Sequence, residues 1–160
     1  MSALAPAICH VEQVDLEVAN KALVAWGHRM GPCKRPNADI WAHALFEHGE
    51  PVAVTIAAGL IAETCAGFTR AEAFELARLC AARPTLCRVM LRLWREMVAP
   101  AICRVHGYRW AVSYQDKALH TGNTYRLDGW DVVGESRSGT DRRSGRKGRS
   151  KRIWGWEFAA

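Results

Sequence analysis

Apolar residues along the chain recur with two spacings, one typical of β-strands and one typical of α-helices. The run at 40–61 is interrupted by His48, Gly49 and Glu50, which predict the turn of a β-hairpin. Runs rich in β-branched and aromatic residues predict strands at 8–14, 40–47, 51–61, 108–114, 130–135 and 153–158.

Three further segments predict helices and a loop. Residues 15–28 predict a helix with Asp15 as its N-cap and with apolar residues near one face, and the proline-containing segment 29–39 predicts a loop. The segment 83–107 predicts a longer helix with Pro84 in its first turn. Pro100 must kink or restart that helix, because proline cannot donate the backbone hydrogen bond.

Two segments complete the pattern. Residues 118–130 predict a short helix that closes near Gly129. The segment 71–82 is ambiguous, because its alanines favour a helix whereas Phe74 and Leu76 partly suit a strand; periodicity alone selects the helix. The order of elements predicts a single α+β domain, with α/β-like character, whose mixed central sheet is flanked by helices over residues 1–160.

The composition fits one folded, reduced domain. Nearly half of the 160 residues are apolar and seven are tryptophan, enough apolar surface for a core. The six cysteines contain no CxxC pair, so neither a disulfide framework nor a zinc site is predicted. The start of the chain lacks the features of a signal peptide, and no apolar run reaches the roughly 20 residues of a membrane-spanning helix. We therefore expect a cytoplasmic protein without membrane contact; the sequence leaves its oligomeric state open, with a homodimer as one possibility.

The positive charge is concentrated in one segment. Residues 136–152 contain eight Lys or Arg and one Asp, a charge of +7, so the rest of the chain is near −1 although the total is +6. A Gly/Ser-rich basic segment before a final strand predicts a loop that suits a polyanion such as DNA, with a solubilising segment as the alternative. Its cations are Arg137, Arg142, Arg143, Arg146, Lys147, Arg149, Lys151 and Arg152.

The candidate chemistry lies in the stretch 113–135. Tyr114, Asp116, His120 and Tyr125 follow a predicted strand, where active-site groups commonly sit, and could project toward one crevice. Asp116 and His120 could exchange protons, and Tyr125 could donate a hydrogen bond to a leaving group. In the alternative, which spacing alone favours, Asp116 caps the next helix, His120 is a surface residue and Tyr125 packs on the core.

The segment from "ELARLCAARP" to "WAVSYQDKALHTGNTYRLDGWDVVGE" resembles the C-terminal half of GNAT-type acyltransferases, and more narrowly the Mom-type DNA-modification proteins of phages and prophages. The resemblance covers 44–135 and is carried by Ser113-Tyr114, Asp116, His120, Gly122, Thr124-Tyr125 and Gly129-Trp130. It implies a GNAT-like fold in which the segment 71–82 is a splayed strand that pairs with the pantetheine arm of acyl-CoA, so a strand replaces the helix there.

The resemblance also implies ligands and site residues. It implies acetyl-CoA or a related acyl donor, although the segment 82–90 lacks the glycines of the usual pyrophosphate loop. The expected donor contacts are Leu79, Cys80, Arg83, Thr85 and Arg88. Mom-type proteins place a carbamoylmethyl group on the adenine amino nitrogen of DNA, with iron implicated. That likeness implies Tyr114, Asp116 and Tyr125 as site residues and His28 with Asp116 as iron ligands.

Three functions follow from these features. The first is an enzyme that transfers a small acyl-type group to a nucleobase amine in DNA, with the target base flipped out of the duplex. The second is an acetyl-CoA-dependent N-acetyltransferase that acts on a protein or small-molecule amine. The third is a DNA-binding protein without catalytic activity.

Overall fold

The computed structural model describes residues 8–36, 38–136 and 148–159. Its strands are β1 (Cys9–Gln13), β2 (Ile40–Glu47), β3 (Glu50–Gly59), β4 (Thr64–Cys65), β5 (Phe68–Thr69), β6 (Ala73–Ala81), β7 (Trp110–Asp116), β8 (Asp131–Ser136) and β9 (Lys151–Glu157). Its helices are α1 (Leu16–Ala25), α2 (Leu86–Leu93), the π-helical segment η1 (Trp94–Val98), α3 (Ala99–His106) and α4 (Asn123–Asp128). None of these helices is long and apolar enough to cross a bilayer.

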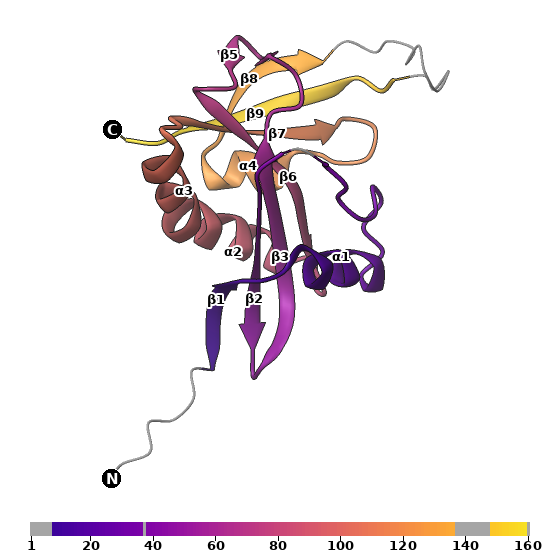
Figure 1. Ribbon diagram of the computed structural model, residues 1–160. Coiled ribbons are helices and arrows are strands. Elements are labelled where there is room, and N and C mark those ends of the chain that lie inside the picture. The colour runs from indigo at the N-terminus through magenta and orange to yellow at the C-terminus, as the bar shows by residue number, and fades with distance from the viewer. Residues whose placement is uncertain (1–7, 37, 137–147, 160) are drawn as a thin grey trace.

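The main sheet has seven strands in the order β1-β2-β3-β6-β7-β9-β8, and β4 with β5 forms a separate small hairpin. Within the described residues β6 and β7 are parallel and the other neighbours in this sheet are antiparallel, so the prediction of a mixed sheet is confirmed. The parallel pair is short, running from Ala73 opposite Trp110 to Glu75 opposite Val112. In Figure 1, β7, β8 and β9 cross the upper part of the molecule, whereas the antiparallel pair of β2 and β3 extends through its lower part.

Helices cover both faces of the main sheet (Figure 1). On one face α1 buries Ala19, Ala22 and Leu23 against residues of β2, β3 and β6. We call this side, which also carries the loop between α1 and β2, the loop face. On the other face α2, η1 and α3 pack Leu91 and Trp94 against the sheet, and α4 lies beside α2. We call this side the helix face.

The segment 71–82 is a strand, β6, as the resemblance implies, and the helix favoured by its periodicity is wrong. The reason lies in tertiary structure. β6 pairs with β3 along most of its length and is covered on both faces, so buried residues occupy adjacent positions. A strand buried on both faces loses the apolar–polar alternation that would distinguish it from a buried helix.

The predicted helix over 83–107 is interrupted, as its second proline requires. Pro100 has no N–H to donate to the carbonyl of Glu96, and the wider turn of η1 precedes it before α3 resumes. Pro84 lies two residues before α2 rather than within its first turn. The last helix is also shorter than predicted, because α4 begins at Asn123.

The hairpin prediction is confirmed by its backbone conformation. His48 and Gly49 have φ values of 51° and 84°, and both positive values match a type I′ turn. Asp15 occupies the N-cap position of α1, but its side chain makes no capping hydrogen bond. The small β4–β5 hairpin was not predicted.

Candidate functional site

The candidate site lies where β6 and β7 separate. Their last paired residues are Glu75 and Val112. β6 then carries a β-bulge at Ala77, the residue without a partner in the register with β3. A bulge bends its strand and increases the local twist. β6 therefore continues to Ala81 without a described pairing to β7, which leaves a stretch of its backbone unpaired on that side.

Directly after the paired residues, the side chain of Ser113 on β7 bonds to the backbone of β6. The Ser113 hydroxyl donates to the backbone carbonyl of Leu76 at 3.0 Å. The Tyr125 hydroxyl lies 2.7 Å from the same Ser113 oxygen. Since the single hydrogen of Ser113 is given to Leu76, Tyr125 is the donor of the second bond. Burial raises the pKa of the Tyr125 phenol, although its bond with Ser113 opposes this, so the hydroxyl is protonated at neutral pH.

Close packing against β7 and β9 positions Tyr125 on α4. Its ring stacks on Trp154, with centroids 5.8 Å apart and planes 19° from parallel. The Trp154 indole N–H donates to Gln115 at 2.8 Å. Gly122, at the N-cap of α4, has a φ of 77°, and a Cβ there would lie 2.5 Å from the Gln115 side-chain oxygen. The backbone of α4 can approach the sheet so closely because this residue is glycine.

The other end of α4 is fixed by a buried ion pair. The Arg95 guanidinium of η1 makes two hydrogen bonds to the Asp128 carboxylate, at 2.8 and 3.2 Å. The Trp130 indole N–H also donates to Asp128, at 3.0 Å, and Arg95 lies 4.1 Å from the centre of the Trp156 ring. Tyr125 is thus held between two anchored helix ends.

A second polar group lies on the loop face. Glu75 ends the paired part of β6, and its carboxylate is 2.7 Å from the Arg35 guanidinium. Both side chains are buried, with exposed fractions of 10% and 11%. Arg35 also donates to the carbonyl of Gly59 at 3.2 Å, which fixes the loop between α1 and β2 to the sheet. The ion pair with Arg35 fixes the position of this carboxylate, from which it can accept a proton or orient an amine.

Tyr114 and Asp116 lie on the loop face as well. The Tyr114 hydroxyl is 2.9 Å from the Cys65 thiol, and burial raises the pKa of this phenol. Asp116 accepts hydrogen bonds from the Ala118 N–H and from Arg149, at 3.0 and 3.1 Å. Desolvation alone would raise the pKa of Asp116, but these two bonds outweigh it and hold the pKa below its usual value.

The four predicted catalytic side chains are therefore not brought together. Residues alternate between faces along β7, so Ser113 meets Tyr125 on the helix face whereas Tyr114 and Asp116 point to the loop face. His120 is exposed in the turn before α4. The alternative role of Asp116 as a helix cap is wrong, because it caps the turn at Ala118 while Gly122 is the N-cap of α4. Tyr125 does pack on the core, as that alternative predicts.

The expected donor contacts lie along β6 and the turn after it. Leu79 packs on the helix-face core, and Cys80 is buried in the core under α1. Arg83 pairs with Glu47 at 3.0 Å, and Arg88 is exposed on α2. Thr85 precedes α2 without a capping bond. The N–H groups of residues 86 and 87 bond to the carbonyls of residues 83 and 84, so this turn does not present them to a phosphate.

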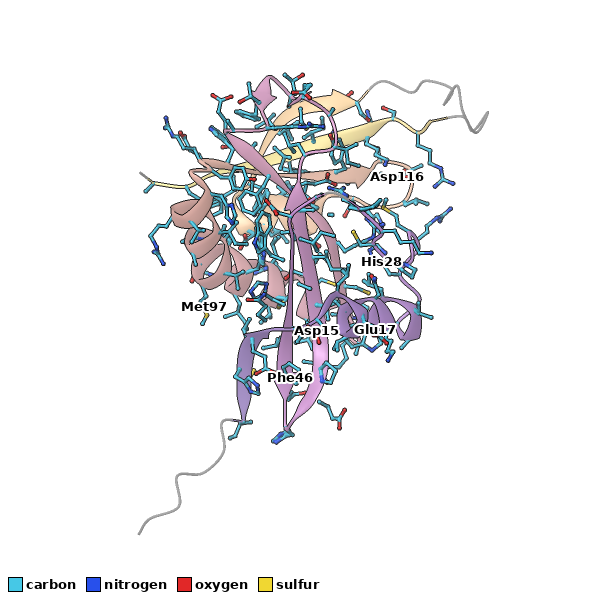
Figure 2. All side chains as sticks on the ribbon, viewed as in Figure 1. Asp15, Glu17, His28, Phe46, Met97 and Asp116 are labelled. Carbon is cyan, nitrogen blue, oxygen red and sulfur yellow. The ribbon has the colours of Figure 1, made fainter. Side chains whose placement is uncertain are left out.

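The predicted iron site is not formed. Among the residues that the structure describes, no group of three His, Cys, Asp or Glu side chains could hold a metal ion. His28 and Asp116 lie on the same flank of the molecule in Figure 2, yet no third described ligand joins them. The residues present do not fit the iron that the resemblance implies.

The basic segment is described only at its C-terminal end. Arg137, Arg142, Arg143, Arg146 and Lys147 lie outside the described residues. Arg149 binds Asp116 on the loop face, Lys151 lies 5.8 Å from the Tyr114 ring centre, and Arg152 lies 6.0 Å from that of Trp154. The described end of this segment therefore adjoins the point where β7 leaves the sheet.

Sequence reasoning assigned no site role to three residues described here: Ser113, Glu75 and Arg35. One signal was available, because Glu75 is a single carboxylate inside the apolar run "AFELARL". If this segment is a buried strand, the Glu75 carboxylate is buried as well and requires a charged or hydrogen-bonding partner. The identity of that partner, Arg35, could not be predicted from the sequence, because it lies 40 residues earlier in the chain.

Solved structures match nearly the whole chain, whereas neither a family model nor a curated protein matches the sequence. A probable acetyltransferase from Staphylococcus epidermidis ATCC 12228 has a TM-score of 0.62 at 8% identity, covering 94% of this chain and 99% of that one. A probable GNAT-family acetyltransferase from Chromobacterium violaceum ATCC 12472 has a TM-score of 0.61 at 12% identity, covering 96% and 89%.

A GNAT-family acetyltransferase from Elizabethkingia anophelis, solved with acetyl-CoA bound, has a TM-score of 0.56 at 9% identity and covers 94% of this chain and 99% of that one. Identities this low establish likeness of fold. The GNAT-like part of the resemblance is thus confirmed: the chain has the α+β fold of the GNAT acetyltransferases.

Proposed function

We propose that this protein transfers an acyl group from a coenzyme A thioester to an amine. The observation that carries the proposal is the Tyr125 phenol, hydrogen-bonded to Ser113 where β6 leaves β7. The reaction forms a C–N bond and breaks a C–S bond. It also delivers one proton to the departing sulfur and removes one from the amine, so the site needs an acid and a base.

Tyr125 is the proposed acid. Its hydroxyl is protonated because burial raises the pKa of the phenol, and Ser113 orients its oxygen toward the diverging strands. A phenol that gives its proton to the sulfur needs a nearby group to stabilise the resulting charge. The Ser113 hydroxyl can do so by turning its hydrogen from the Leu76 carbonyl to the Tyr125 oxygen.

Glu75 is the proposed base. It lies on the loop face and Tyr125 lies on the helix face, but both adjoin the point where β6 and β7 separate, so an acyl group held between the two strands would be reached from either side. One carboxylate oxygen, Oε2, binds Arg35, and Oε1 has no hydrogen-bond partner among the described residues. This oxygen can accept the proton that the amine loses. Tyr114 lies close enough to Glu75 that the carboxylate charge contributes to its raised pKa, so its neutral hydroxyl can orient the acceptor. Asp116, which binds Arg149, and His120, whose backbone N–H donates to the Asp116 carbonyl, lie further along the chain.

The site suits the extended arm of the acyl donor better than it suits the donor's phosphates. The unpaired backbone of β6 after Ala77, which includes Leu79 and Cys80, suits an extended amide-containing arm that adds to it like a strand. The turn at 82–85 has no glycine, and the two N–H groups after it are already bonded. The side chains of Arg83, Thr85 and Arg88 would hold the phosphates in place of backbone groups. When bound, the thioester supplies the activated acyl carbonyl.

The test is release of free thiol from acetyl-CoA in the presence of a panel of primary amines. Tyr125→Phe should lower kcat by about 10² or more, the usual contribution of a positioned acid. Tyr108→Phe is the matched control, because its ring packs on Phe74 away from Ser113. Equal kcat for Tyr125→Phe and the parent, with both folded by circular dichroism, would rule out this role for Tyr125.

A narrower candidate acceptor is a nucleobase amine in DNA. The contact between Arg149 and Asp116 favours it, because it brings the described end of the basic segment to the loop face. Eight cations in residues 136–152 would neutralise phosphates and make binding steeply dependent on salt. Nucleosides from DNA of expressing cells should then contain a new modified base by mass spectrometry, lost when these cations are changed to glutamine. Unmodified DNA alongside acylation of a free amine would exclude this acceptor.

A further inference from the structure

Arg78 is a charged side chain of the loop face that acyl transfer itself does not require. The bulge at Ala77 adds one residue to β6, so Arg78, three residues after Glu75, lies on the same face as Glu75. Its guanidinium donates through Nε to the Gly31 carbonyl at 3.1 Å and through Nη1 to the Ala77 carbonyl at 2.9 Å. Two backbone oxygens thus hold a half-buried cation at the start of the unpaired stretch of β6.

Arg78 makes no ion pair of its own among the described residues, although the more distant Glu75 carboxylate favours its charge. The neighbouring Arg35 is neutralised by Glu75 at 2.7 Å. None of the described carboxylates lies within 4.0 Å of the Arg78 guanidinium, and its Nη2 has no hydrogen-bond partner among the described groups. Burial lowers the pKa of Arg78, which reflects the cost of removing its charge from water. A partly buried cation of this kind is stabilised by an anionic ligand.

A second polar side chain, His28, lies near enough that, in addition to burial, the charge of Arg78 contributes to its lowered pKa. The imidazole Nδ1 of His28 is buried and has no hydrogen-bond partner within the described part of the chain. Burial, with the nearby charges of Arg78 and His120, lowers the pKa of His28, so its ring is neutral at pH 7. His28 comes from the loop between α1 and β2, and Arg78 from β6. Two polar groups from separate elements therefore lie on the loop face with hydrogen-bonding capacity left, near enough for the charge of one to act on the other.

We infer that Arg78 binds an oxyanion, a carboxylate or a phosphate, on the acceptor amine, with His28 as the second contact. The inference rests on the proposed function and specifies its substrate class: a small primary amine that carries an anionic group. A guanidinium presents N–H groups in a planar fork that matches both oxyanions, which lysine does not. Arg78 is a specificity-determining residue in this reading, and Glu75 and Tyr125 act on the reacting atoms.

The test compares three primary amines of similar length: propylamine, 3-aminopropanoate and 2-aminoethyl phosphate. With acetyl-CoA as donor, kcat/KM for at least one anionic amine should exceed that for propylamine about 10- to 100-fold, as expected for a charge-assisted hydrogen bond. Arg78→Gln should bring this ratio toward one, and Arg78→Lys should retain part of it. Arg104→Gln, an exposed arginine on α3, is the control that keeps the parent ratio. The preferred anion identifies carboxylate or phosphate.

Binding separates this inference from the proposed function. The anionic amines should raise the thermal midpoint of the parent protein and of Arg104→Gln more than propylamine does, and should lose that advantage with Arg78→Gln. The absence of thiol release with every amine would refute acyl transfer, whereas the thermal midpoints would still test the oxyanion site. Equal effects of all three amines in both assays would overturn the oxyanion site. An oligonucleotide that raises the midpoint while neither small anion does so would also overturn it, in favour of DNA.

Discussion

The ion pair between Arg95 and Asp128 is expected to be one of the most sensitive points of the fold. The exposed fractions of these two side chains are 12% and 3%, and two hydrogen bonds join them. Asp128→Ala removes the carboxylate and leaves both the Arg95 guanidinium and the Trp130 indole N–H without that acceptor. Breaking a buried pair by removing one partner costs about 3–5 kcal/mol, because a buried charge is left uncompensated.

The structure favours the lower end of this range. Arg95 has a second, weaker contact with Glu96 at 3.4 Å, which remains in the variant and keeps part of the charge compensated. We therefore expect a loss of about 3 kcal/mol in the free energy of unfolding. In a chain of 160 residues this corresponds to a fall of about 6–12 °C in Tm, at about 2–4 °C per kcal/mol.

Urea unfolding followed by tryptophan fluorescence measures this loss, since Trp94, Trp130 and Trp154 are buried in the affected core. Replacing both partners, as Arg95→Met with Asp128→Leu, should recover most of the stability because no charge is then stranded. Glu17→Ala, which breaks an exposed pair with Lys21, is the control and should leave the midpoint unchanged. A loss below about 1 kcal/mol for Asp128→Ala, or a double variant no better than the single one, would refute this reasoning.

Two further predictions concern other parts of the molecule. Gly122→Ala should lower the free energy of unfolding by about 1–3 kcal/mol in urea, because Gly122 has a φ of 77° and the added Cβ would lie 2.5 Å from Gln115 and 2.8 Å from Trp154. Gly31→Ala is the control: Gly31 also has a positive φ but has open space around it, so this change should cost less. Burial lowers the pKa of both His28 and His43 from 6.5, so the unfolded chain binds protons at these sites before the folded chain does as the pH falls. The contribution of the two neutral rings to the free energy of unfolding is therefore complete above about pH 6.5 and is lost as the pH falls below it. His43→Gln should reduce the fall in urea midpoint between pH 7.5 and 5.5, and the exposed His10→Gln should not; an unchanged slope for His43→Gln would contradict this.

Much of the fold was predictable because its elements are marked locally. The hairpin at His48 and Gly49 follows from turn chemistry, and the break near Pro100 follows from a missing N–H. β6 was not predictable from periodicity, because burial on both faces removes the alternation. The strand was predicted instead from the resemblance to GNAT-type proteins, which reflects the whole fold and not only the neighbouring residues.

The candidate site was predictable only in part for a related reason. Tyr125 was identified by its motif, and alternation along β7 could have separated Ser113 from Tyr114. The bulge that turns Arg78 to the face of Glu75 has no local sequence mark. Neither does a contact such as that between Arg35 and Glu75, which depends on how the loop after α1 returns to the sheet. Such features arise from tertiary structure.

The pairing between β6 and β7 is the shortest described in the main sheet, so we expect the strands on its two sides to open separately. The β7–β9–β8 part of the sheet is joined to the β1–β2–β3–β6 part by three residue pairs, the bond from Ser113 to Leu76, two backbone bonds to the Glu72 carbonyl and the core of the helix face. Parts joined by so few backbone bonds can open separately at a lower free energy than global unfolding. Amide hydrogens of β8 and β9 should then exchange as one group, faster than those of β3. A ligand that bridges β6 and β7 would tie the two parts together, so its binding should slow exchange in strands that it does not touch.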